Sequence, residues 1–203
     1  MKSIKKEVIY QTVINKSNFI NYLIPVSSID DVNSELKNLR KKYPDASHHC
    51  FAYLLGKRQD IQKFSDDGEP SKTAGFPMLE VLKKNELTDV LNVSIRYFGG
   101  VKLGAGGLVR AYTKGCAEAV KLAELSSLTA FTVMDVTIPF DYIGAIEKYL
   151  RDNYTLLDTT YDTKVHYKIE LKQLYNRDVT SAIPEKTNGT GTIFVLDTYE
   201  KYV

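Results

Sequence analysis

The chain has 203 residues, of which 43% are apolar and 26% charged, and its formal net charge is +2. These proportions are ordinary for a globular protein in water, and the length suits one or two compact domains. No apolar run approaches the roughly 18 residues of a membrane span, and the first residues lack the apolar core of a signal peptide. We therefore expect a cytoplasmic protein with no membrane partner.

Charge is divided unevenly along the chain. Residues 1–130 carry 19 basic and 14 acidic side chains, a net charge of +5, whereas residues 131–203 carry 8 and 11, a net charge of −3. Only the first part has a bulk electrostatic reason to approach phosphate. The two cysteines, Cys50 and Cys116, fall in apolar patterns, which favours buried thiols over a disulfide.

The first elements follow from local patterns. Residues 7–14 and 17–24 predict two strands that form a hairpin across a short polar turn. A helix follows, because Ser28 and Asp31 have the spacing of a capping box and Tyr43-Pro44 ends the apolar period. We expect the next two strands at residues 49–55 and 61–64.

The middle of the chain predicts a helix, a strand and a second helix. Pro77 suits a first helical turn. Residues 91–97 alternate apolar and polar side chains, which predicts a half-buried strand with Arg96 pointing away from the apolar face. The next helix is expected to open at Gly107-Leu108 and to end near Ser126-Ser127.

The last third predicts a second domain, so the expected division is 1–130 and 131–203. Its elements follow the order βαββαβ, which is that of a ferredoxin-like domain. The predicted strands cover residues 131–139, 155–161, 165–171 and 192–196, and the predicted helices cover residues 141–153 and 177–185.

A glycine-rich loop is the first candidate site. Five of the twelve glycines fall between a strand and a helix: Gly99, Gly100, Gly104, Gly106 and Gly107. Backbone NH groups at such a turn attract anions, and Arg96, Lys102 and Arg110 would add positive charge. Tyr97 and Phe98 would offer stacking surfaces for nucleic-acid bases. The alternative is that the glycines only permit close packing of the strand on the helix.

An acidic turn is the second candidate site. Asp66, Asp67 and Glu69 could bind a divalent cation or act as acid and base. They could equally close the turn and favour the start of the next helix, and if they face Arg96 or Lys102 an ion-pair network is expected. No second group of cysteines and histidines completes a zinc site around His48, so we expect no metal.

These residues also carry a family resemblance. The segments 65–70 and 73–75, together with residues 96–100 and Gly104, resemble the signature of the IMPACT/YigZ family, in which His48 matches a histidine position. The resemblance implies an α+β fold of two domains. The N-terminal one is expected to be a ribosomal-protein-domain-2-like βαβ fold, and the C-terminal one to be similar to the ferredoxin-like modules of elongation factor G.

The resemblance also implies a link to translation. Eukaryotic relatives are connected with restraining a starvation-activated kinase of translation initiation, and they add an N-terminal interaction domain that this sequence does not show. We therefore expect a non-catalytic cytoplasmic binding protein that contacts RNA, the ribosome or another phosphate anion through the glycine-rich loop. The C-terminal domain would contact a protein partner.

The main alternative is a metal-dependent hydrolase or phosphate-transferring enzyme that uses the acidic turn; a third is an adaptor acting through the C-terminal domain alone. The first hypothesis needs no catalytic residue, metal or cofactor. Its anion-binding residues are Arg96, Tyr97, Phe98, Gly99, Gly100, Lys102, Gly104, Gly106, Gly107 and Arg110, with His48, Asp66, Asp67 and Glu69 at the rim.

Overall fold

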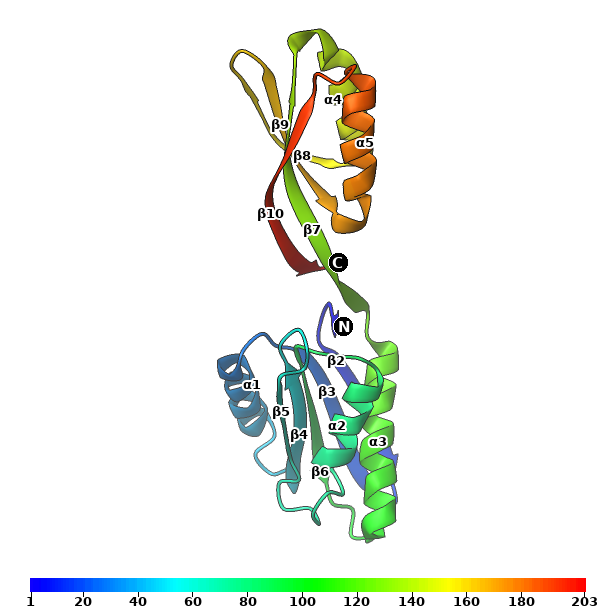
Figure 1. The fold of residues 1–203 in the computed structure, drawn as a ribbon. Coiled ribbons are helices and arrows are strands. Elements are labelled where there is room, and N and C mark those ends of the chain that lie inside the picture. Colours follow the sequence, from blue (N-terminus) through cyan, green and yellow to red (C-terminus); the bar gives the residue numbers. More distant parts are fainter. The chain divides into compact units, whose positions relative to one another are not determined.

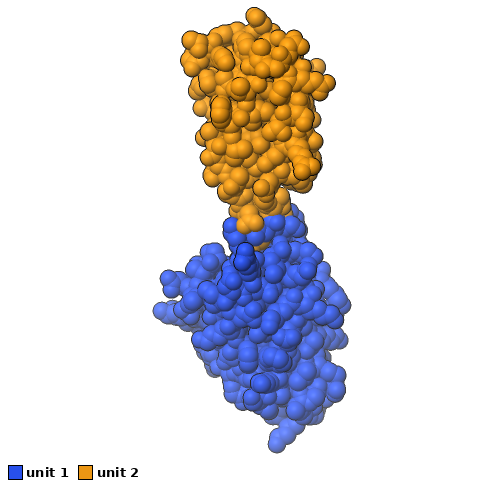
Figure 2. Space-filling model, viewed as in Figure 1, with its two compact units in different colours: residues 1–128 blue, residues 129–203 orange.

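The computed structural model describes residues 1–203, and the chain divides into two compact units, residues 1–128 and 129–203 (Figure 2). Both contain helices packed on a sheet, so the protein belongs to the α+β class. The division falls two residues before the predicted boundary and lies inside one strand, β7 (Leu125–Ile138). None of the helices is long and apolar enough to span a membrane.

The first unit is built on a five-stranded sheet in which all neighbours are antiparallel (Figure 1). Its strands, in spatial order, are β2 (Val8–Ile14), β3 (Ser17–Pro25), β6 (Val90–Tyr97), β4 (His48–Leu55) and β5 (Ile61–Ser65). Both predicted strand pairs are present. The strand β6 inserts between them and holds the two pairs in one sheet.

Helices cover both faces of this sheet. Helix α1 (Ile29–Lys42) packs on one face, and helices α2 (Gly75–Lys84) and α3 (Gly104–Leu122) pack on the other (Figure 1). Each face has its own apolar core. The α1 start is as predicted, because the Ser28 side chain accepts a hydrogen bond from the Asp31 backbone NH at 3.1 Å.

The expectation of a half-buried β6 is wrong. Because β6 is the central strand and has helices over both faces, its polar residues are buried as deeply as its apolar ones. Val93 and Ile95 face α1, so the alternation sends Asn92, Ser94 and Arg96 beneath α2 and α3. Arg96 is only 4% exposed and lies in the interior.

Two predicted boundaries of α3 are also corrected. The helix begins at Gly104, three residues before the expected start, and ends at Leu122. The serines expected at its end belong to β7, where Leu125–Ser127 pair with an unanticipated strand, β1 (Lys2–Ile4). The pairing partner lies more than 120 residues away in the sequence, which a local pattern cannot reveal.

The second unit follows the predicted βαββαβ order. After β7 come α4 (Ile143–Asn153), β8 (Thr155–Tyr161), β9 (Val165–Lys172), α5 (Asn176–Lys186) and β10 (Thr192–Tyr202). The sheet order is β10-β7-β9-β8, with β7 and β9 at the centre. A core of apolar side chains from β7, β9, α4 and α5 holds this unit together. Strand β10 is six residues longer than expected.

Candidate functional site

The acidic turn follows β5 directly, and its first carboxylate builds the start of α2. Asp66 Oδ1 accepts hydrogen bonds from the backbone NH groups of Ala74 at 3.0 Å and Gly75 at 2.8 Å, and Oδ2 accepts one from Lys72 at 2.7 Å. These NH groups have no partner inside the helix, and no other side chain caps it. Both carboxylate oxygens of Asp66 are therefore occupied by hydrogen bonds at the start of α2.

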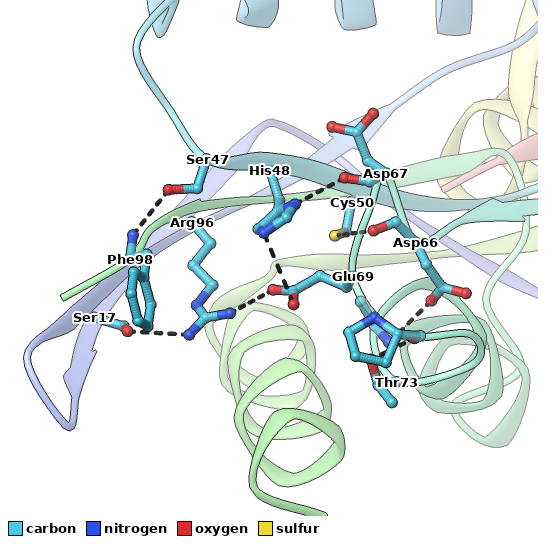
Figure 3. Close-up of polar contacts among 12 residues, drawn as sticks. Ser17, Ser47, His48, Cys50, Asp66, Asp67, Glu69, Thr73, Arg96 and Phe98 are labelled. Carbon is cyan, nitrogen blue, oxygen red and sulfur yellow. Dashed lines mark hydrogen bonds and ion pairs between the residues drawn. The ribbon is translucent and has the colours of Figure 1, made fainter. Parts of the chain in front are cut away.

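The second carboxylate ties the turn to α1 and β4. Asp67 accepts a 2.8 Å bond from Arg40 on α1 and a 2.6 Å bond from the His49 backbone NH. Burial alone would raise the pKa of Asp67, but the bonds from Arg40 and His49 outweigh it and hold the pKa below its usual value. The backbone carbonyl of Asp67 accepts a 2.8 Å bond from His48 Nδ1 (Figure 3).

The third carboxylate, Glu69, points into the interior. Its side chain is 4% exposed, and Oε1 accepts a bond from Arg96 Nη1 at 2.7 Å (Figure 3). The same oxygen accepts a bond from the Tyr112 hydroxyl at 2.6 Å. The other oxygen, Oε2, lies 3.9 Å from His48 Nε2, which is beyond hydrogen-bond range. Glu69 and Arg96 thus form a buried ion pair.

Arg96 is held on several sides. Besides Glu69, it donates to Ser17 Oγ at 3.2 Å, and its guanidinium lies 5.4 Å from the ring centroids of both Phe19 and Phe98. Its Nε is buried and has no hydrogen-bond partner. The expectation that Arg96 supplies free positive charge is therefore wrong, because Glu69 neutralises it.

A buried thiol and phenol complete this network. Cys50 donates to the Asp66 carbonyl at 3.0 Å, and its sulfur also lies 3.4 Å from the Tyr112 hydroxyl. Burial raises the pKa of Cys50 to about 12 and also raises the pKa of Tyr112. Both groups stay protonated at neutral pH, so Cys50 is not a thiolate nucleophile.

The glycines of the loop serve different needs. A Cβ on Gly99 would come within 2.0 Å of the Lys16 carbonyl, so this glycine permits close packing on the hairpin turn. Gly100 and Gly104 have φ angles of +82° and +70°, which favour glycine, although a Cβ at either position would meet nothing within 4 Å. Gly106 and Gly107 lie in the first turn of α3.

The start of α3 is electrostatically open. No side chain caps it, and its first turn contains no acidic residue. The positive end of the helix dipole, which the NH groups of the first turn form, is therefore not compensated by any side chain. Lys102 and Arg110 are exposed, and neither forms an ion pair or a side-chain hydrogen bond. An anion that reaches this end meets only positive groups on the helix itself.

A pocket of about 310 Å³ lies between the acidic turn and the glycine-rich loop. The buried pair of Glu69 and Arg96 forms its inner end, and the exposed residues Phe98 and Lys102 belong to its mouth. The remaining lining residues are Pro70, Leu103, Gly104, Ala105 and Leu108.

The structure joins some of the predicted residues and separates others. Tyr97 packs with the α1 core on the opposite face of the sheet, so it cannot stack with a ligand beside Phe98. Asp66 and Asp67 point to α2 and α1. Arg110 lies one to two turns along α3 and does not line the pocket.

Sequence reasoning missed three polar contributors. Ser17 accepts from Arg96 and also from the Gly99 NH at 3.2 Å, which fixes the loop on the hairpin. Tyr112 bonds to Glu69, and Arg40 bonds to Asp67; neither was among the candidate residues. No local pattern indicates these roles, because the partners of all three residues lie in segments distant in the sequence.

Fold and site together describe a two-unit α+β protein with an open, positively charged helix start, and the comparisons identify its family. The Impact N-terminal domain family matches residues 15–120. The chain is 38% identical to IMPACT family member YvyE of Bacillus subtilis, over 94% of this chain and 88% of that protein. It is 32% identical to an IMPACT family member of Haemophilus influenzae, over 95% of each.

A solved structure, described as the crystal structure of a hypothetical protein, covers 97% of both chains with a TM-score of 0.62 and 28% identity. The chain belongs to the IMPACT family, and the resemblance drawn from its residues is confirmed.

Proposed function

We propose that this protein is a non-catalytic cytoplasmic binding protein associated with translation, and that it contacts RNA or ribosome phosphate through the start of α3 and the glycine-rich loop. The observation that carries the proposal is the uncapped start of α3 beside the exposed and unpaired Lys102. The link to translation rests on the family resemblance.

The physical argument is electrostatic. A helix start carries about half a positive elementary charge, and an anion there gains roughly 0.3–1 kcal/mol at an exposed position. Lys102 and Arg110 each add a full charge within the same region, and residues 1–130 carry a net charge of +5. Contacts of this kind release counterions from nucleic acid, so binding should weaken steeply as salt rises.

The arrangement of the acidic turn favours a binder over the metal-dependent hydrolase. Both Asp66 oxygens are occupied by backbone NH groups, both Asp67 oxygens are occupied, and Glu69 is neutralised by Arg96. The three carboxylates thus point to three different partners. Bringing them onto one cation would break the cap of α2 and a buried ion pair.

The test is co-sedimentation with ribosomes over a salt series, with two substitutions at one exposed position. Ala105→Glu places a negative charge in the first turn of α3, which favours the helix but repels phosphate. Ala105→Gln is the uncharged control of the same shape. We expect the glutamate variant to pellet least and the glutamine variant to behave like wild type.

A second pair of variants tests the side-chain charges. Lys102→Ala combined with Arg110→Ala should lower the slope of log affinity against log salt by about 1.4–1.8, the value for two phosphate contacts. Lys41→Ala, which removes an exposed charge from α1 on the other face of the sheet, is the matched control. Equal pelleting of all variants would overturn the proposal.

A protein contact through the second unit is a second candidate function. Strand β10 pairs only with β7, and Phe194, Val195 and Leu196 are 62%, 57% and 54% exposed. An apolar edge strand can take an added strand from a protein partner. Ribosome association that persists without residues 129–203 would contradict a role of this unit in that association.

A further inference from the structure

The two residues at the inner end of the pocket keep one donor and one acceptor that form no hydrogen bond. Arg96 lines the pocket, its side chain is 5% exposed, and its Nε–H has no partner. Glu69 also lines the pocket, and its Oε2 accepts no hydrogen bond. A buried donor without a partner is costly, so a group that satisfies Arg96 Nε would be favoured there.

An aromatic ring lies beside this pair. Phe98 lines the pocket and is 48% exposed. Its backbone is fixed, because its NH donates to Ser47 Oγ at 3.0 Å (Figure 3). An exposed ring on a fixed backbone is a surface on which a flat ligand can stack.

The mouth of the pocket carries Lys102 and the start of α3. Lys102 and the backbone of Gly104 and Ala105 line it, so the open start of α3 borders the same hollow. One cavity therefore combines a hydrogen-bonding pair within, a stacking surface at one side and an anion site at its edge.

We propose that this pocket takes one unstacked nucleotide of single-stranded RNA. The base lies against Phe98, its edge faces the buried pair of Arg96 and Glu69, and its phosphate lies at the start of α3 near Lys102. The Watson–Crick edges of the bases place a donor beside an acceptor, so such an edge can pair with a guanidinium NH and a carboxylate oxygen together. The inference rests on the proposed function and adds which part of the RNA is bound.

The size of the cavity limits the occupant. About 310 Å³ is at the lower end of the range for small-ligand pockets, so it accommodates one nucleotide but not a stacked pair. A duplex cannot present a free base edge to the buried pair, because its bases are already paired. Single strands should therefore bind more tightly than the same strand in a duplex.

The experiment measures fluorescence anisotropy of a labelled short single-stranded RNA and of its duplex at one salt concentration. Phe98→Ala should weaken single-strand binding about tenfold, since stacking contributes roughly 1–3 kcal/mol per base, and should leave duplex binding unchanged. Phe140→Ala, at 47% exposure in the second unit, is the matched control. Lys102→Ala should weaken both.

Competition separates the base from its phosphate and free nucleotide from RNA. Nucleoside monophosphates should displace the RNA from the pocket, whereas ribose 5-phosphate, which has the same phosphate and no base, should displace it far less. Equal displacement by the two would overturn the inference.

Single-strand binding that depends on Lys102 but not on Phe98 would also overturn it, while leaving the proposed phosphate contact intact. Wild-type protein that binds ribosomes but no single-stranded RNA would overturn the nucleotide pocket alone. Absence of binding to both RNA and ribosomes would overturn the proposed function as well.

Discussion

Removing the carboxylate of Glu69 should destabilise the first unit far more than removing an exposed acid. Glu69 and Arg96 are 4% and 5% exposed at their side chains, and Glu69→Ala leaves the guanidinium with only Ser17 as a partner. Breaking a buried pair from one side costs about 3–5 kcal/mol. The Tyr112 hydroxyl also loses its acceptor, so we expect a loss near the upper end of that range.

Amide hydrogen exchange of β6 measures this loss in the first unit alone, because the most protected amides exchange through unfolding of the unit that contains them. Glu124→Ala is the control, since Glu124 pairs with Lys5 at 2.8 Å but both side chains are about half exposed. The double variant Glu69→Leu/Arg96→Met should lose less than Glu69→Ala, because it leaves no unpaired charge. A cost of Glu69→Ala below about 1 kcal/mol, or one equal to the control, would refute the reasoning.

Three further predictions concern the acidic turn and the buried thiol. Asp66→Ala should cost about 1–2 kcal/mol through loss of the α2 cap, measured as faster exchange of the α2 amides, and unchanged exchange would contradict the capping role. Asp67→Asn should destabilise the protein at neutral pH, measured as the free energy of unfolding in urea. Because the pKa of Asp67 is lowered in the folded state, the difference in this free energy from wild type should be full above pH 3.8. It should disappear as the pH falls through the folded pKa. If the stability difference did not change with pH, the charge of Asp67 would not be its cause. The Cys50 thiol, with its pKa raised to about 12, should not react with Ellman's reagent at pH 8 until the protein is unfolded; rapid native reaction would contradict its burial.

Local chemistry determined what could be predicted from the sequence. The hairpin of β2 and β3 follows from alternating apolar residues and a polar turn, and the Ser28 cap involves residues three positions apart. The βαββαβ order of the second unit follows from the change of apolar period along the chain. In each case the residues that specify the element lie within or beside it.

What could not be predicted depends on which segments meet. The alternation of apolar and polar residues in β6 is typical of a strand with one solvent-exposed face. Arg96 is buried only because β6 lies at the centre of the sheet. The acidic turn and Arg96 were expected to form an ion pair if they faced each other, and they do, through Glu69. The predicted start of α3 lies three residues after the observed one. Gly104 and Gly106 are poor helix formers, so the local sequence did not indicate that the helix contains them.

The most direct test of the central claim is a backbone amide titration by ¹H–¹⁵N NMR with single-stranded RNA. The account predicts that the largest shifts arise at Gly104, Ala105, Gly106 and Gly107, because their NH groups would meet the phosphate, and that Ala105→Glu abolishes them. Shifts that spare this turn and gather on α1 or on the second unit would contradict the account.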